Sequence, residues 1–157
     1  MKEAIFERLK SFPGIWDLKP GQRLIVERVV PKKDVFAALC TGFGKSLTFQ
    51  IFKCFLDQGF NIHVPAFQLV IVVSPLSSIV KDQVGFLRNL GFEVVFIGES
   101  EKLDKDIIGG NVKAQFLYGS PESLVGDIKF KEMLSQLHYR WNVVAIVCDQ
   151  VHTVVHW

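Results

Sequence analysis

The sequence lacks any apolar run long enough to cross a bilayer. Its longest runs, Leu69–Val73 and Val143–Cys148, fall far short of the roughly 20 residues that a membrane-spanning helix requires. The first residues carry charges every few positions, so they lack the apolar stretch of a secretory signal. These absences predict a soluble, intracellular chain with no membrane partner.

Cysteine is scarce, and neither sign of charge dominates. The three cysteines, Cys40, Cys54 and Cys148, have no CxxC spacing, which argues against a disulfide framework. We expect them to be reduced thiols of a nuclear or cytoplasmic protein. Because 18 basic residues nearly balance 16 acidic ones, for a formal net charge of +2, charge alone does not indicate a nucleic-acid partner.

Repeats, low-complexity tracts and strong linkers are absent as well, so one domain over residues 1–157 is expected. Hydrophobic residues make up 49% of the chain and the mean hydropathy is +0.28, which is apolar for a domain of this size. Either the strands are buried on both faces, or an apolar surface is available to a partner.

Apolar segments of strand length alternate with segments of helical periodicity. This alternation is typical of βαβ units, and the Val- and Ile-rich runs favour strands buried on both faces of a parallel sheet. The expected fold is α/β, a parallel sheet of about five or more strands with helices on both faces. Polar residues 99–111 are expected to form a surface excursion or a weak helix. The expected strands are Val35–Leu39, Leu69–Val73, Val94–Ile97, Gln115–Tyr118 and Val143–Cys148, and the expected helices lie within residues 1–12 and at Gly21–Val30, Lys45–Leu56, Ser77–Leu90 and Phe130–His138.

The segment TGFGKS, from Thr41 to Ser46, has the composition and the setting of a phosphate-binding loop. It follows an expected strand and opens an expected helix. Gly42 and Gly44 allow backbone N–H groups to turn toward phosphate oxygens, and the helix N-terminus adds partial positive charge. Lys45 can reach the β- and γ-phosphates, and Ser46 can hold Mg²⁺.

Two residues depart from the usual form of this loop. The strict motif has glycine where this chain has Leu39, and Phe43 is bulky at a position that usually carries a small residue. The alternative to a phosphate loop is a glycine turn that caps an ordinary helix.

Three further segments have residue types suited to binding. In LKPGQ, residues 18–22, the residues taken alone favour a Pro-Gly turn before a helix, although the amide of Gln22 also offers a donor and an acceptor that suit the N6 and N7 edge of adenine. Ser-Pro-Leu at 74–76 and Ser-Pro-Glu at 120–122 follow expected strands, where hydroxyls and a helix N-terminus suit a DNA backbone. Taken singly, each of these two segments favours a capping turn between strand and helix.

Taken in order, these segments and CDQVH at 148–152 resemble the motifs of RecQ helicases, and the resemblance covers nearly the whole chain. It implies a RecA-like lobe with ATP, Mg²⁺ and DNA as ligands, and with the ATP site at the carboxyl edge of the sheet. The resemblance implies that Mg²⁺ is bound by Ser46 and Asp149. It implies that the nucleotide is contacted by Lys19, Gln22, Thr41, Gly42, Phe43, Gly44, Lys45 and Ser46. It also implies catalytic roles for Lys45, Asp149 and position 150, and a role for His152 in coupling the ATP site to DNA. The residues that it implies contact DNA are Ser74, Pro75, Leu76, Ser120, Pro121 and Glu122.

The resemblance fails at Gln150, where the family has a glutamate that orients and deprotonates the attacking water. An amide cannot take that proton, and losing a general base costs about 10² to 10⁴ in rate. Val151 replaces a small alanine beside it. The family also binds ATP between two lobes, and these residues contain no second lobe, so we expect them not to unwind DNA alone.

Two functions therefore remain open. The first is the ATP-binding lobe of a 3'-5' DNA helicase of repair and recombination, with weak or no hydrolysis. The second is a non-catalytic, ATP-dependent interaction module whose exposed face meets a second lobe or another protein. A small-molecule kinase is less suitable, because it would leave the Ser-Pro-Leu and Ser-Pro-Glu segments unexplained.

Several other residues invite alternative roles. Asp149, His152 and His156 would resemble a zinc site if the segment were helical. We instead expect His63 to lie in a loop, the three phenylalanines of the helix at 45–56 to pack in the core, and the side chains of Lys81 and Arg88 to be solvated. The phenylalanines are Phe49, Phe52 and Phe55.

Overall fold

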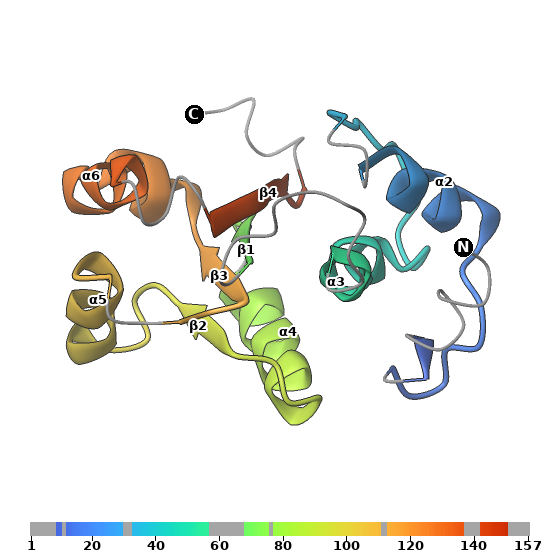
Figure 1. Ribbon diagram of the computed structural model, residues 1–157, viewed down its shortest axis with the longest axis horizontal. Helices are drawn as coiled ribbons and strands as arrows, with labels where there is room; N and C mark the ends of the chain where they lie inside the picture. The colour runs from blue at the N-terminus through green and yellow to red at the C-terminus, as the bar shows by residue number, and fades with distance from the viewer. Residues whose placement is uncertain are drawn as a thin grey trace. The chain divides into compact units, whose positions relative to one another are not determined.

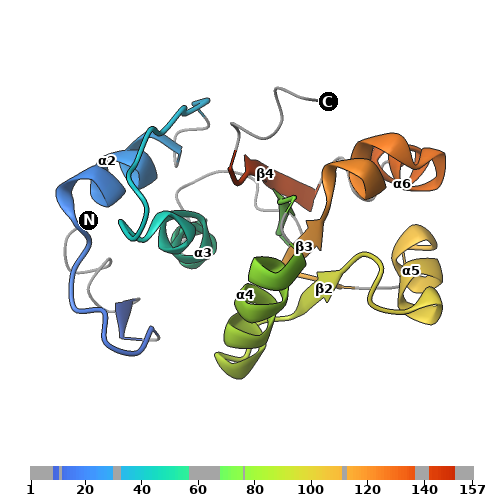
Figure 2. The same ribbon diagram turned by 180° about the vertical axis from the view of Figure 1, so that it is seen from behind.

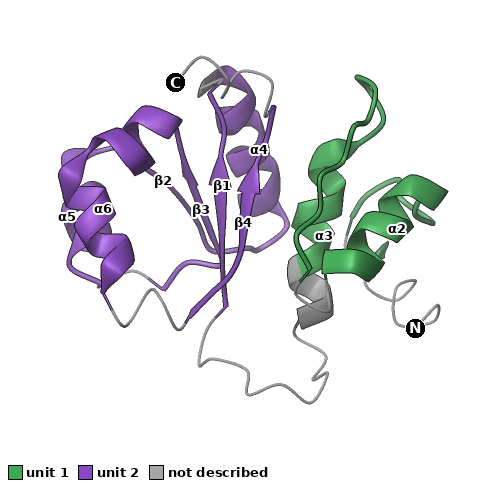
Figure 3. Cartoon of the chain, turned by 90° about the horizontal axis from the view of Figure 1, so that it is seen from above, with its two compact units in different colours: residues 1–63 green, residues 64–157 purple. Residues whose placement is uncertain are grey.

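The structure is a computed structural model that describes residues 9–10, 12–29, 33–56, 68–75, 77–110, 113–136 and 142–150, without the side chains of 53–56 and 77. The chain divides into two compact units, residues 1–63 and residues 64–157 (Figure 3), which are described in turn. The single domain expected over residues 1–157 stays a prediction.

In the described part of the first unit, the helices α2 (Pro20–Val29) and α3 (Lys45–Leu56) pack against each other (Figure 1). Proline suits the first position of α2 because its missing N–H has no helical partner there. Both helices agree with the expected ranges to within one residue at each end. The buried residues here are Gln22 and Val26 on α2, Thr48, Phe49, Gln50, Ile51 and Phe52 on α3, and Leu9, Phe12 and Leu18 before α2.

The strand expected at Val35–Leu39 is not formed. Residues 33–40 have no regular secondary structure, and the side chain of Phe36 is 81% exposed. An extended segment becomes a strand only when a neighbour takes its backbone hydrogen bonds. The described residues of the first unit contain helices and no strand, so they offer this run no such neighbour.

The second unit is built on a parallel sheet of four described strands in the order β2-β3-β1-β4, as Figure 2 shows from behind. All three pairings are parallel. The predicted bounds of β1 and β4 are confirmed to the residue, and those of β2 and β3 to within one residue. The strands are β1 (Leu69–Val73), β2 (Val94–Phe96), β3 (Phe116–Gly119) and β4 (Val143–Cys148).

Helices lie on both faces of this sheet, as predicted for an α/β fold. Figure 3 shows α4 on one side and α5 with α6 on the other. The polar stretch at 99–111 contains a helix, α5, whose first turn is capped by Ser100 through a bond from the Leu103 N–H. The helices are α4 (Ser77–Asn89), α5 (Glu101–Ile108), a π-helical turn η1 (Glu122–Gly126) and α6 (Ile128–Ser135).

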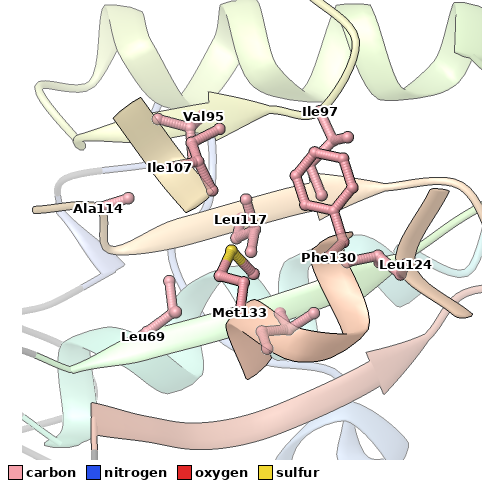
Figure 4. Close-up of a cluster of buried hydrophobic side chains, with 10 residues drawn as sticks. Leu69, Val95, Ile97, Ile107, Ala114, Leu117, Leu124, Phe130 and Met133 are labelled. Atoms are coloured by element: carbon pink, nitrogen blue, oxygen red, sulfur yellow. The ribbon is translucent and has the colours of Figure 1, made fainter. Parts of the chain in front are cut away.

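The main core lies between the sheet and the α5/α6 layer (Figure 4). Alternate strand residues point to this side, and α6 contributes Phe130 and Met133, which are three positions apart on one helical face. Leu117 of β3 lies among them and is almost fully buried. Within the described part of the chain, no helix combines the length and the apolar character needed to span a membrane.

Of the two possibilities that the hydropathy left open, β4 shows an exposed apolar surface in place of burial on both faces. Its residues are half-buried or exposed, and Ile146 is 66% exposed. In the described sheet β4 lies at the edge beside β1, whereas β1 has a strand on each side. The same Val- and Ile-rich composition therefore occurs in a central strand and in an edge strand.

Arg88 is exposed, as expected, but its side chain also has partners within the fold. Its guanidinium donates to both carboxylate oxygens of Glu99, at 2.8 and 2.7 Å, and to the carbonyl oxygen of Val94 at 3.0 and 2.8 Å. Arg88 therefore ties the end of α4 to the backbone of β2 and to the turn that follows it. The hydrogen bonds from Arg88 hold the pKa of the Glu99 carboxyl below its ordinary value.

The Arg88–Glu99 pair should make stability depend on pH. A carboxyl whose pKa is lower in the folded state stabilises that state above its unfolded pKa, about 4.3, and the contribution is lost as the pH falls further. We expect the free energy of unfolding to fall between about pH 5 and pH 3 more steeply in the native chain than in Glu99→Gln. Chemical denaturation across this range measures it, with exposed Glu132→Gln as the control. Equal slopes in the two proteins would contradict the pairing.

Gly119, at the end of β3, should not tolerate a side chain. A Cβ atom there would lie 2.8 Å from Cγ of Leu124 and 3.2 Å from Cδ1 of Ile97. Gly119→Ala should lower the free energy of unfolding by about 1–3 kcal/mol through overpacking. Gly85→Ala is the matched control, because it meets no atom within 4 Å on α4 and should stabilise by roughly 0.5–1 kcal/mol. Urea denaturation that ranks the two variants in the opposite order would refute this account.

Candidate functional site

The candidate phosphate loop of the first unit is a turn that runs directly into α3. The N–H of Phe43 donates to the Cys40 carbonyl at 3.3 Å, and α3 begins at Lys45. Gly42 has φ 77° and Gly44 has φ 87°, values that side chains rarely permit. The glycines are therefore required by the path of the backbone.

The end of this loop suits an anion. The first N–H groups of a helix have no partners within the helix, and α3 has no acidic residue in its first turn to compete for them. The Lys45 ammonium lies beside the loop, where it donates to the carbonyls of Leu39 at 3.2 Å and Cys40 at 3.4 Å. Phosphate oxygens could replace those two carbonyls as acceptors.

The segment at 18–22 lies against this loop. The amide nitrogen of Gln22 donates to the carbonyls of Phe43 at 3.1 Å and Gly44 at 3.0 Å, and Lys19 Nζ donates to the Phe43 carbonyl at 3.2 Å. Two segments about twenty residues apart, both implicated in nucleotide contact, are thus joined in the structure. Adenine recognition by Gln22 stays a prediction.

The ring of Phe43 has a defined place that the sequence did not reveal. A Cβ atom at Gly21 would lie 3.2 Å from the ring, and Lys19 Nζ is 4.8 Å from the ring centroid. The available signal was an aromatic residue in the loop together with the Pro-Gly step at the start of α2. This signal could be interpreted only once the structure showed that the loop and the start of α2 are in contact.

In the second unit, the predicted site residues gather at the carboxyl edge of the sheet. The Ser74 N–H donates to the Gly119 carbonyl at 3.0 Å, and the Asp149 N–H donates to the Val73 carbonyl at 2.9 Å. Ser74, Ser120 and Asp149 therefore follow three neighbouring strands at the same level. Parallel pairing brings them together, because the ends of parallel strands meet at one edge.

The residues expected to contact DNA differ in accessibility. Ser74 is 2% exposed, and its hydroxyl has no hydrogen-bond partner among the described residues. Pro121 is buried, Pro75 and Ser120 are half-buried, and Glu122 is exposed. Ser120 also caps the following turn, since its Oγ accepts the Ser123 N–H at 3.2 Å. Their contact with DNA stays a prediction.

Asp149 and Gln150 follow the last residue of β4 and differ in burial and backbone conformation. Asp149 is 9% exposed, and its carboxylate is the kind of hard oxygen ligand that Mg²⁺ accepts while keeping several waters. Gln150 has a φ of 59°, in the left-handed region where non-glycine residues are uncommon. Among the described residues, no three His, Cys, Asp or Glu side chains are grouped closely enough to hold a metal ion.

Some predicted residues lie outside the described part of the chain. They are Leu76, the coupling candidate His152, and the other members of the alternative zinc and loop interpretations, His156 and His63, together with the side chains of Phe55 and Cys54. Cys40 and Cys148 are described, and both are exposed free thiols.

Comparison with known proteins finds similarity along nearly all of the chain. It is 31% identical over 95% of its length to a putative ATP-dependent DNA helicase Q1 of Caenorhabditis briggsae, and 31% identical over 99% to an ATP-dependent DNA helicase RecQ of Haemophilus influenzae. A putative ATP-dependent RNA helicase of Acanthamoeba polyphaga mimivirus is 33% identical over 93%. The chain spans 24%, 23% and 25% of these three relatives.

The family model described as DEAD/DEAH box helicase matches residues 19–157. That range contains the Gln22 segment, the glycine loop, and the strand ends that carry Ser74, Ser120 and Asp149. The parallel sheet with helices on both faces is the RecA-like architecture expected for such a domain. The chain therefore belongs to the DEAD/DEAH box helicase family.

Proposed function

We propose that this chain is the ATP- and nucleic-acid-binding first lobe of a RecQ-like 3'-5' DNA helicase. The observation that carries the proposal is the turn at 41–44, in which two glycines of positive φ lead into α3 with Lys45 at its first position. The similarity to RecQ helicases over nearly the whole chain supports it. Roles in repair and recombination, and a nuclear or cytoplasmic location, belong to the same proposal.

In this proposal the first unit supplies the groups that bind the phosphates of ATP. Backbone N–H groups of the loop and of the start of α3 bind phosphate oxygens, and Lys45 adds a positive charge. Ser46 and Asp149 supply oxygen ligands for Mg²⁺, which when bound would neutralise charge on the β- and γ-phosphates. The residue chemistry suits each ligand, since N–H groups and an ammonium suit an anion and a carboxylate suits a hard cation.

Hydrolysis is the step that this chain performs poorly. Attack on the γ-phosphate requires a water molecule that is oriented and relieved of its proton, and the amide of Gln150 can orient water but cannot accept the proton. Unwinding requires two lobes that move relative to each other. We therefore propose that these 157 residues, which correspond to one lobe, do not unwind DNA without a second lobe.

A second candidate, an interaction module that binds ATP without hydrolysing it, is favoured by the same amide at Gln150. Its nucleotide would stabilise a surface that another protein or a second lobe recognises. The two candidates share the ATP site and differ in whether turnover responds to nucleic acid.

The charge of Lys45 should contribute much of the ATP affinity. Its ammonium must exchange two carbonyl acceptors for charged phosphate oxygens, and charge-assisted hydrogen bonds of this kind contribute about 1.5–3 kcal/mol. We expect Lys45→Met to weaken ATP binding by roughly 10- to 100-fold in calorimetric titration. The exposed Lys81→Met should bind ATP as the native chain does. Unchanged affinity in Lys45→Met would reject the phosphate loop.

Restoring a carboxylate at Gln150 should restore slow hydrolysis. We expect Gln150→Glu to raise DNA-stimulated ATP turnover by up to about 10²-fold, the lower end of the general-base effect, with little change in ATP affinity. Glutamate and glutamine have similar backbone preferences, so the φ of 59° imposes the same demand on both. Phosphate release measured with DNA, with RNA and without nucleic acid reports the effect.

The control for that assay is Gln136→Glu, which adds the same charge at an exposed position after α6. A gain in Gln150→Glu that requires DNA supports the helicase lobe. Stimulation by RNA in place of DNA would contradict the DNA assignment. No gain under any condition would show that the amide is not what limits hydrolysis.

A further inference from the structure

The buried amide of Gln22 is fully engaged as a donor. Its side chain is 3% exposed, its nitrogen donates to the carbonyls of Phe43 and Gly44, and its oxygen accepts the Lys19 N–H at 2.9 Å. A glutamine amide has two N–H donors and one oxygen with two lone pairs. Both donors are therefore committed to the loop, and one lone pair remains for another ligand.

These two hydrogen bonds determine which way the loop peptides face. In a planar trans peptide, the carbonyl and the N–H of the same unit point in opposite directions, and none of the described peptide bonds is cis. Because the carbonyls of Phe43 and Gly44 turn toward Gln22, the N–H groups of Gly44 and Lys45 turn away from it. These are the loop N–H groups nearest the start of α3.

The surroundings of the loop reinforce this orientation. The Phe43 ring lies against Gly21, and Lys19 Nζ contacts both the ring face and the Phe43 carbonyl. A Cβ atom at Gly44 would lie 2.7 Å from Nε2 of Gln22. The amide therefore fits against the loop only because residue 44 is glycine.

We propose that Gln22 is a positioning residue for the phosphate loop. Through its two hydrogen bonds the loop presents the N–H groups of Gly44 and Lys45 to phosphate even when no base is bound. This inference rests on the proposed ATP site and deepens it. An adenine that used both the donor and the acceptor of Gln22 would have to take Nε2 from the loop. Base recognition and phosphate recognition are thereby linked through one side chain.

The discriminating ligand is inorganic tripolyphosphate, which carries the phosphates without a base. With the full chain, we compare calorimetric affinities for Mg-tripolyphosphate and Mg-ATP. Gln22→Met keeps the volume of the side chain and removes its hydrogen bonds. We expect about tenfold weaker binding of both ligands, since misaligning the loop donors loses on the order of one hydrogen bond's contribution.

Two further variants complete the experiment. Gln50→Met makes the same change at a buried position of α3 that has no hydrogen bond to the loop, and it should bind both ligands as the native chain does. Phe43→Ala removes the ring but leaves the backbone carbonyl, and it should also weaken tripolyphosphate binding. This variant keeps the test decisive if Gln22→Met does not fold, which the thermal unfolding curve reveals.

The outcomes separate the inference from the function on which it rests. Loss of ATP affinity in Gln22→Met with native tripolyphosphate affinity would overturn the inference, because Gln22 would then act on the base alone. Equal losses in Gln50→Met would overturn it by showing a general packing effect. If the native chain binds neither ligand, the proposed ATP site itself fails.

Discussion

The backbone pairing of β1 organises the second unit, because this strand bonds to β3 on one side and to β4 on the other. Both pairings are parallel, so the three strands end at one edge and deliver Ser74, Ser120 and Asp149 to the same level. The core beneath them depends on the same pairing, since alternate residues of each strand face the α5/α6 layer. Arg88 joins α4 to this sheet, because its guanidinium donates to the carbonyl oxygen of Val94 in β2.

The first unit presents a different kind of chemistry. The groups that we propose bind ligand are mostly backbone N–H groups, whose directions depend on backbone conformation, and one ammonium. The positive φ values of Gly42 and Gly44 allow the turn, and the Gln22 amide holds two of its carbonyls. A loop of this kind can bind phosphate with few side-chain contacts, because its donors are aligned before the ligand arrives.

At position 150, the backbone conformation and the ability of the side chain to accept a proton are separate properties. The backbone at this position keeps a left-handed conformation that costs a non-glycine residue about 1 kcal/mol, and Asp149 beside it remains buried at the strand end. The substitution of an amide for a carboxylate therefore concerns proton acceptance more than position. Ligand binding and hydrolysis rest on different atoms, so one can persist when the other is weakened.

The sequence alone determined most of the local elements and the order of the motifs. The bounds of β1 and β4 followed from their apolar runs, and those of α2 and α3 followed from periodicity and from their Pro and Gly punctuation, because these signals act within a few residues. Only tertiary structure decided that Val35–Leu39 is not a strand, that β4 lies at the described sheet edge, and that Arg88 and Phe43 have partners. Each of those outcomes depends on which distant segment supplies a hydrogen bond or a packing surface, and residue type does not encode that information locally.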